Sequence, residues 1–195
     1  MYNPRMNHEK IYYLDIGTGS GGKYITQDSP SLTRVGLDLQ VFDLVSAKTQ
    51  YGIEPILIDA QVDELRGLPF RDNSFEQIDI ILPINSLLYS LAARGELLWK
   101  ELHRVLIQNG KINVVIDNPA AGFQGVTLHG EREDIPDPAL NVYMRAKEAG
   151  FEVDASLLDH EDLDRIGTAT SKRLAPFLDQ SHAQTLFYSI TATKL

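Results

Sequence analysis

Short apolar segments recur along the first two thirds of the chain, and polar stretches separate them. These segments are rich in β-branched residues and are apolar at successive positions rather than at alternate ones. Continuous apolar character is typical of strands that are buried on both faces of a parallel sheet. The predicted strands are Ile11–Ile16, Val35–Leu39, Pro55–Ile58, Ile78–Ile84 and Ile112–Ile116.

Between these segments the apolar positions follow a helical period. Residues 41–48 fit a helix that ends near Gly52, and Glu96–Gln108 fit a second helix that ends at Asn109-Gly110, a common C-terminal signal. Trp99, the single tryptophan, lies on the second helix, where we expect it to pack in the core. Alternating strands and helices predict βαβ units and a doubly wound, Rossmann-like sheet.

The last third of the chain has a different pattern. Gly122–Pro138 is rich in glycine, proline and acidic residues and is predicted to be a loop, and Pro138 is expected to open a helix that runs to Gly150. Phe151–Leu157 and Thr185–Thr193 have the composition of strands, one of them antiparallel, with a helix over Glu161–Leu174 between them. We therefore predict one α/β domain over residues 1–195, with a mostly parallel sheet and a terminal antiparallel strand.

Composition and charge narrow the possible functions. The 195 residues include 18 Lys and Arg against 27 Asp and Glu, a formal net charge of −9, so no general basic field attracts nucleic acid or an anionic membrane. Cysteine is absent, which excludes disulfides, thiolate zinc sites and a cysteine nucleophile, and the five histidines show no metal-binding spacing. No apolar run reaches the roughly 18 residues of a membrane span, and Met1–Lys10 lacks the apolar core of a signal peptide. A soluble cytoplasmic protein without a metal site is expected.

A glycine-rich segment follows the first predicted strand and precedes a predicted helix. Glycines at such a corner let the backbone approach a ligand closely, and the helix N-terminus adds amide donors. The spacing satisfies both G-x-G-x-x-G, through Gly17, Gly19 and Gly22, and G-x-G-x-G, through Gly17, Gly19 and Gly21. The loop alone therefore indicates a cofactor that contains adenosine. It does not distinguish a dinucleotide from other adenosine-containing cofactors.

Two acidic residues near the glycine-rich segment help to distinguish a dinucleotide from other adenosine-containing cofactors. Asp38, followed by Leu39, ends the second predicted strand, where a carboxylate accepts hydrogen bonds from ribose hydroxyls. Asp15 precedes the glycines, where it would repel a pyrophosphate but attract a cationic amino-acid group. S-adenosylmethionine carries an ammonium and a sulfonium and no phosphate, so these residues favour it over a nicotinamide dinucleotide.

With these features, the sequence resembles the class I methyltransferases over nearly its whole length. By this resemblance, the loop from Asp15 through Thr18 to Gly21 holds the methionine part of S-adenosylmethionine and Asp38 holds its ribose. Asp59 would accept from the adenine amino group, and the Ala60 amide would bond the adenine ring. The matching segments are Asp15–Gly21, Asp38, Asp59-Ala60, Leu68–Phe70, Asp72–Phe75 and Glu96–Lys111.

Two further segments, Thr170–Ala175 with the strand after it and Pro83–Leu88, resemble the aminoglycoside-resistance 16S ribosomal RNA methyltransferases that act on adenine N1. In that family each segment carries a tryptophan, and the pair sandwiches the flipped adenine; the matching positions here are Ile84 and Thr170. Lys172-Arg173 is the only adjacent pair of Lys or Arg residues in the sequence, so a ribosomal acceptor would require phosphate contacts through these two residues, with Arg165 as a further candidate. The acceptor is left open between an RNA base and a small molecule, because both stacking tryptophans are missing and the net charge is negative.

Asn85 and Ser86, just past the fourth predicted strand, are the candidate catalytic residues. Methyl transfer is an in-line displacement, so a nitrogen acceptor with a free lone pair chiefly needs to be oriented by hydrogen bonds. The alternative for both residues is that they cap the following helix. Two other functions also remain open: a nicotinamide-dependent reductase, and a binding module that holds the cofactor without turnover.

Overall fold

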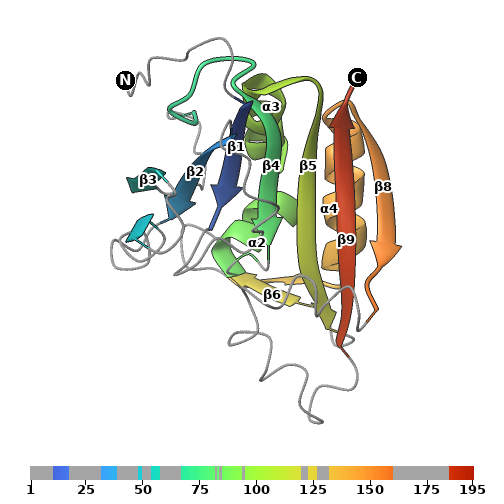
Figure 1. Cartoon of the computed structure of the whole chain (residues 1–195). Coiled ribbons are helices and arrows are strands. Elements are labelled where there is room, and N and C mark those ends of the chain that lie inside the picture. The colour runs from blue at the N-terminus through green and yellow to red at the C-terminus, as the bar shows by residue number, and fades with distance from the viewer. Residues whose placement is uncertain are drawn as a thin grey trace.

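The computed structural model contains a seven-stranded β-sheet (Figure 1), in the order β3-β2-β1-β4-β5-β9-β8. The structure describes residues 11–17, 32–38, 48–49, 54–57, 67–81, 83, 85–93, 95–119, 123–126, 132–159 and 185–195. The strands are β1 (Ile11–Ile16), β2 (Leu32–Asp38), β3 (Glu54–Leu57), β4 (Phe75–Ile81), β5 (Leu106–Pro119), β8 (Phe151–Leu157) and β9 (Thr185–Lys194).

The first five of these strands are parallel, and β9 runs antiparallel to both of its neighbours, β5 and β8. The mostly parallel sheet with a terminal antiparallel strand is thereby confirmed. From β1 the chain moves outward to β2 and β3, then returns to the other side of β1 to form β4. The strand order reverses between β1 and β4, and such a switch point is where open α/β sheets bind ligands, at the carboxyl ends of the strands.

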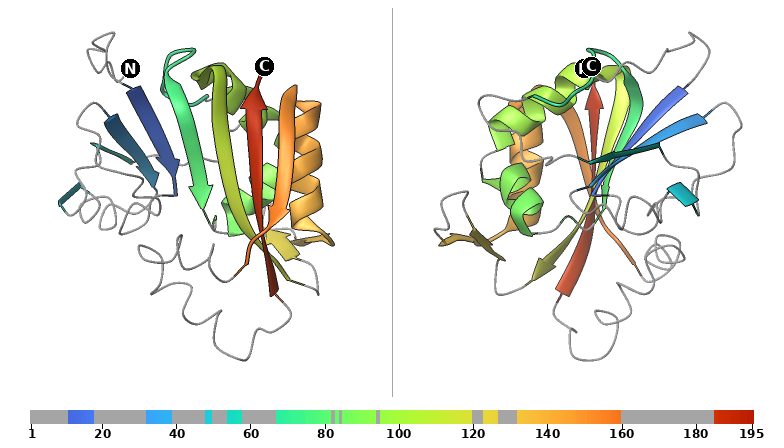
Figure 2. Two further views of the ribbon diagram at one scale, coloured as in Figure 1. Left: turned by 45° about the vertical axis from the view of Figure 1, so that its right-hand side comes forward. Right: turned by 90° about the vertical axis from the view of Figure 1, so that its left-hand side faces the viewer.

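Helices α2 (Asn85–Ala92), α3 (Gly95–Val105) and α4 (Pro138–Glu148) lie on one face of the sheet, which Figure 2 shows edge-on in its right-hand view. The large core between these layers contains alternate strand residues such as Ile78 and Ile80. Trp99 is fully buried in it, donates its indole N–H to the Leu91 carbonyl at 3.0 Å and packs edge-on against Phe151. The expected core role of the tryptophan is confirmed. No helix in the described part of the chain is long and apolar enough to cross a membrane.

The boundary between α3 and β5 differs from the prediction. The helix expected to reach Gln108 ends at Val105, and Leu106 already pairs with Phe75 of β4. Asn109, at φ 61°, takes the left-handed conformation inside the strand segment. Gly110 is needed for space, because a Cβ there would lie 2.7 Å from Leu106 Cγ. The Asn109-Gly110 pair therefore marks an irregularity within β5 and not the end of the helix.

The predicted loop over Gly122–Pro138 contains a second, two-stranded antiparallel sheet. Its strands are β6 (Phe123–Val126) and β7 (Arg132–Ile135), and β6 contacts α2. The sequence did not predict these short strands because glycine, proline and acidic residues have low strand propensity. Pro138 opens α4 as predicted, and the Asp137 side chain caps it by accepting the Leu140 N–H at 3.0 Å.

Strand boundaries otherwise agree with the prediction to within a few residues, except that β5 begins six residues before Ile112. The helix expected over Glu161–Leu174 lies outside the described residues. Of the helix expected over residues 41–48, the structure describes only Lys48, which is helical together with Thr49.

Candidate active site

The carboxyl end of β1 forms a tight corner. The chain leaves the sheet at Gly17, whose φ of +73° lies in the left-handed region that favours glycine. The Gly17 N–H donates to the Leu37 carbonyl of β2 at 2.8 Å, which fixes the corner to the neighbouring strand. Among the described residues, a Cβ at Gly17 would meet Leu87 Cδ2 at 3.8 Å, an ordinary contact, so it is the backbone conformation that favours glycine here.

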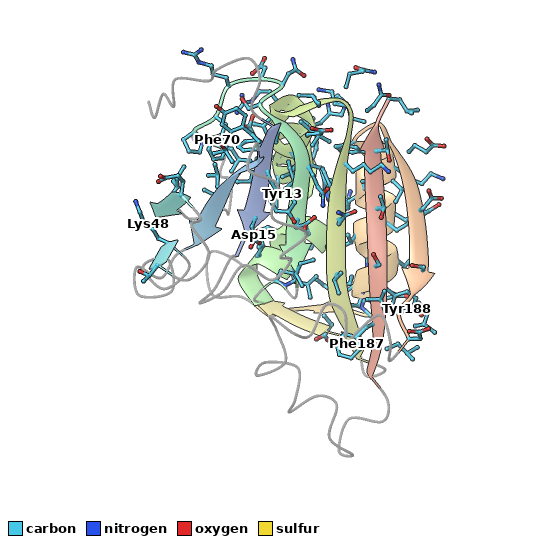
Figure 3. The ribbon with its side chains drawn as sticks, in the orientation of Figure 1. Tyr13, Asp15, Lys48, Phe70, Phe187 and Tyr188 are labelled. Atoms are coloured by element: carbon cyan, nitrogen blue, oxygen red, sulfur yellow. The ribbon has the colours of Figure 1, made fainter. Side chains whose placement is uncertain are left out.

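Asp15 lies two residues before this corner (Figure 3) and is 5% exposed. Its register partners are Gly36 on β2 and Asp79 on β4. Because Gly36 has no side chain, the β2 side of Asp15 is not crowded by a neighbour in its own row. Asp38 is the last residue of β2 and follows Leu37, the register partner of Ile16. Asp15, Gly17 and the backbone of Asp38 therefore come together at the carboxyl ends of two adjacent strands.

Asn85 and Ser86 are the first two residues of α2, which begins soon after β4 ends at Ile81. Their positions bring them to the same edge of the sheet as Gly17, because β1 and β4 are parallel neighbours. The remaining predicted site residues lie outside the described part of the chain, and their placement stays a prediction. These are Thr18, Gly19, Gly21, Leu39, Asp59, Ala60, Ile84, Thr170, Lys172 and Arg173.

The structure adds a polar cluster that the sequence reasoning missed. Asp79 is fully buried, and its carboxyl group accepts hydrogen bonds from the Tyr13 hydroxyl, from Gln77 Nε2 at 3.1 Å and from Asn113 Nδ2 at 2.8 Å. Burial raises the pKa of Asp79 to about 7, and the hydrogen bond from Asn113 opposes this shift. The signal in the sequence was a carboxylate inside an apolar segment, Ile78–Ile84, that was predicted to be buried on both faces.

Together these residues define the chemistry of the edge. A buried carboxylate followed by a glycine corner suits a ligand that carries a positive charge and lies against the backbone beside it. Asp38 ends β2, and its role as an acceptor for hydroxyl groups stays a prediction. In the described residues no group of histidines and acidic side chains has the arrangement of a metal site.

Several solved structures share this fold. The 16S rRNA methyltransferase KamB aligns with a TM-score of 0.66 and 22% identity, over 96% of this chain and 89% of that one. A SAM-dependent methyltransferase from Methanosarcina mazei aligns with a TM-score of 0.61 and 18% identity, over 96% and 93%. A structure described as an antibiotic-related methyltransferase aligns with a TM-score of 0.64 and 16% identity, over 95% and 89%.

No curated protein matches the sequence significantly. A family model described as a methyltransferase domain matches residues 14–114, just over half of the chain. That match begins at β1, includes Asp15 and the glycine corner, and ends within β5. The chain thus belongs to the methyltransferase domain family and is an enzyme of this class that uses S-adenosylmethionine.

Proposed function

We propose that this enzyme transfers a methyl group from S-adenosylmethionine to a nitrogen acceptor at the carboxyl ends of β1, β2 and β4. The observation that carries the proposal is the position of Asp15 and the Gly17 corner at the switch point of the sheet, next to the end of β2. A methyl donor with a positively charged amino-acid part fits a buried carboxylate better than a pyrophosphate does.

The buried carboxylate of Asp15 and the left-handed corner at Gly17 fit the cofactor. Asp15 would pair with the ammonium, and the backbone of Gly17, Thr18, Gly19 and Gly21 would line the methionine part. The remaining contacts would come from Asp38 to the ribose and from Leu39, Asp59 and Ala60 around the adenine. When bound, S-adenosylmethionine supplies an electrophilic methyl group on a sulfonium. The role of the chain is then to hold donor and acceptor in line and to orient the acceptor lone pair, through Asn85 and Ser86.

For the acceptor we propose an adenine nitrogen of 16S ribosomal RNA. The likeness of the segments Pro83–Leu88 and Thr170–Ala175 to the ribosomal RNA methyltransferases supports this choice, as does the structural similarity to KamB. Ile84 and Thr170 would then lie against the flipped base, and Lys172 and Arg173 would contact phosphate.

A small molecule with a nitrogen or oxygen acceptor is the second candidate. The net charge of −9 favours it, because binding to folded RNA relies on several cationic contacts to phosphate. Aliphatic or hydroxyl side chains at positions 84 and 170 favour it too, since stacking on an aromatic ring contributes about 1–3 kcal/mol per base.

The deciding experiment measures transfer of a radiolabelled methyl group from S-adenosylmethionine to purified small ribosomal subunits at low and at high salt. Ribosomal activity predicts labelled 16S RNA at low salt, a steep loss with salt, and no labelling by a Lys172→Glu, Arg173→Glu variant. The matched control is Lys48→Glu with Lys147→Glu, which makes the same charge change at exposed positions elsewhere. Absence of labelling at low salt, with cofactor binding intact, would contradict the RNA acceptor and support the small molecule.

A further inference from the structure

A row of polar residues crosses the sheet on the face opposite α2, α3 and α4. Alternation along each strand separates the two faces: Ile78 and Ile80 pack in the core beneath the helices, whereas Ile81 belongs to a separate cluster with Val115. Neighbours in this row are register partners on adjacent strands. From β2 to β8 the row reads Gly36, Asp15, Asp79, Asn113, Thr191 and Asp154.

Asp79 is the hub of this row. Its carboxyl group accepts hydrogen bonds from β1 through Tyr13, from β4 through Gln77 and from β5 through Asn113. The Thr191 hydroxyl of β9 extends the cluster by donating to Asn113 Oδ1 at 3.4 Å. Tyr13 and Asp15 both lie on β1 (Figure 3). The hydrogen bond from Tyr13 therefore joins Asp79 to the strand that carries the candidate cofactor carboxylate.

The cluster can be satisfied with Asp79 either ionised or neutral. The amide groups of Gln77 and Asn113 donate to Oδ1 in both states, while Oδ2 faces the Tyr13 hydroxyl. A hydroxyl group both donates and accepts, so it can turn from donating to a carboxylate to accepting from a carboxylic acid. Tyr13 is therefore the group that reverses when Asp79 gains or loses its proton.

Asp79 and Asp15 are register partners on the adjacent strands β4 and β1. In-register residues on adjacent strands lie about 5 Å apart along the hydrogen-bonding direction, and the Asp15 and Asp79 side chains share a face. Among the described residues, Tyr13 and Asp15 are the titratable groups that face Asp79 from β1. From β5, Lys111 lies one row away and is exposed. Two neighbouring buried carboxylates resist simultaneous ionisation unless a positive charge lies beside them.

We propose that Asp79 is a positioning residue whose protonation state is coupled to cofactor binding through Asp15. A ligand ammonium beside Asp15 stabilises the ionised form of Asp79, so binding releases a proton from the Asp79–Tyr13 pair, and ionised Asp79 in turn strengthens binding by linkage. This inference rests on the proposed role of Asp15 at the cofactor site.

The test is calorimetric titration of the full chain with S-adenosylhomocysteine at several values between pH 5.5 and 8.5. Each pH is measured in two buffers of different ionisation enthalpy, which reports the protons released on binding. We expect the wild type to release a fraction of a proton near neutral pH and to bind about fivefold more tightly at pH 8 than at pH 6. Asp79→Asn should bind with a smaller pH dependence and without that release.

Two further variants, Asp154→Asn and Tyr13→Phe, test whether the proton release depends on Asp79. Asp154→Asn removes an exposed carboxylate from the same row and should keep the wild-type profile. Tyr13→Phe removes one donor to the ionised carboxylate and should shift the proton release to higher pH, whether or not Asp79→Asn folds. Binding with no proton release that depends on Asp79 would overturn this inference alone. No binding of S-adenosylhomocysteine by folded wild-type protein would refute the proposed cofactor site, and this inference with it.

Discussion

Lys194, the penultimate residue of the chain, donates from Nζ to the main-chain carbonyl of His103 at 2.8 Å and so joins β9 to the last turn of α3. The same ammonium donates to the Leu106 carbonyl at 2.7 Å and to Asn73 Oδ1 at 3.1 Å. It is only 9% exposed. A cation at the carboxyl end of a helix complements the helix dipole, and the His103 carbonyl, in the last turn of α3, is among those without a partner inside the helix.

Replacing Lys194 by Met should therefore destabilise the fold. The apolar stem is kept while three charge-assisted hydrogen bonds are lost, so we expect the free energy of unfolding to fall by about 3 kcal/mol. Burial and the nearby Lys194 charge lower the pKa of His103, so this pKa should rise in the variant. Urea unfolding and NMR titration of the imidazole measure the two effects. Lys111→Met, at an exposed site on β5, is the control, and equal stability of both variants would argue against the cap.

Arg104 and Glu101 hold the segment before β4. Arg104 donates to the Leu68 carbonyl at 3.0 Å and to the Phe70 carbonyl at 2.8 Å, while Glu101 Oε2 accepts from the Leu68 N–H at 2.7 Å. The hydrogen bond from Arg104 is the main cause that lowers the pKa of Glu101. A lowered carboxyl pKa contributes stability above the unfolded value, and this contribution is lost as the pH falls through the folded value.

We accordingly expect Glu101→Gln to reduce stability at pH 7 and to have a much smaller effect near pH 3. Urea unfolding at the two pH values checks this. Glu96→Gln, which breaks an exposed pair with Lys100, should change the melting temperature little at either pH. A Glu101→Gln effect of the same size at pH 3 and pH 7 would show that the carboxylate charge is not what holds this segment.

Asp79 predicts a pH dependence of the opposite sign. Its pKa of about 7 lies above the usual 3.8, so the contribution of the neutral side chain is complete below the unfolded pKa and is lost as the pH rises through about 7. Asp79→Asn does not ionise, so its stability relative to the wild type should increase by about 2 kcal/mol between pH 5 and pH 8. Urea unfolding of both proteins at each pH gives this difference, and a constant difference would mean that Asp79 ionises as easily folded as unfolded.

Gly17 offers a test that separates backbone strain from ligand contact. Alanine at φ +73° should cost about 1–2 kcal/mol of stability, while asparagine, which tolerates this region better, should cost less. Gly150, at φ +92° after α4, is the matched control: Gly150→Ala should lose similar stability and leave affinity for S-adenosylhomocysteine unchanged. If Gly17→Ala also binds normally once corrected for stability, the corner does not contact the cofactor.

Sequence pattern predicted the parallel strands and α4 well because their signals are local. Ile11–Ile16 is apolar except at Asp15, and Pro138 fixes its own φ at the start of a helix. The predicted end of α3 was wrong because Leu106 fits both a helical period and a strand. Its pairing with Phe75 of β4 places it in the strand. The Asp79 cluster depends on partners from other strands, such as Tyr13 and Asn113, which no local pattern brings together.

Asp38, at the end of β2, is the residue proposed to hold the ribose of the cofactor. A carboxylate that accepts from two ribose hydroxyls forms charge-assisted hydrogen bonds of roughly 1.5–3 kcal/mol each, so Asp38→Ala should weaken S-adenosylhomocysteine binding at least about tenfold. Calorimetry measures the affinity, and unchanged circular dichroism verifies the fold. S-adenosylhomocysteine should also raise the melting temperature of the wild type, whereas NADH should not, because Asp15 repels a pyrophosphate.

The charge-matched control for Asp38→Ala is Asp154→Asn, on the edge strand β8, which should bind S-adenosylhomocysteine like the wild type. Unchanged affinity in Asp38→Ala would show that the ribose is held elsewhere, and stabilisation by NADH alone would contradict the fit of this site to S-adenosylmethionine.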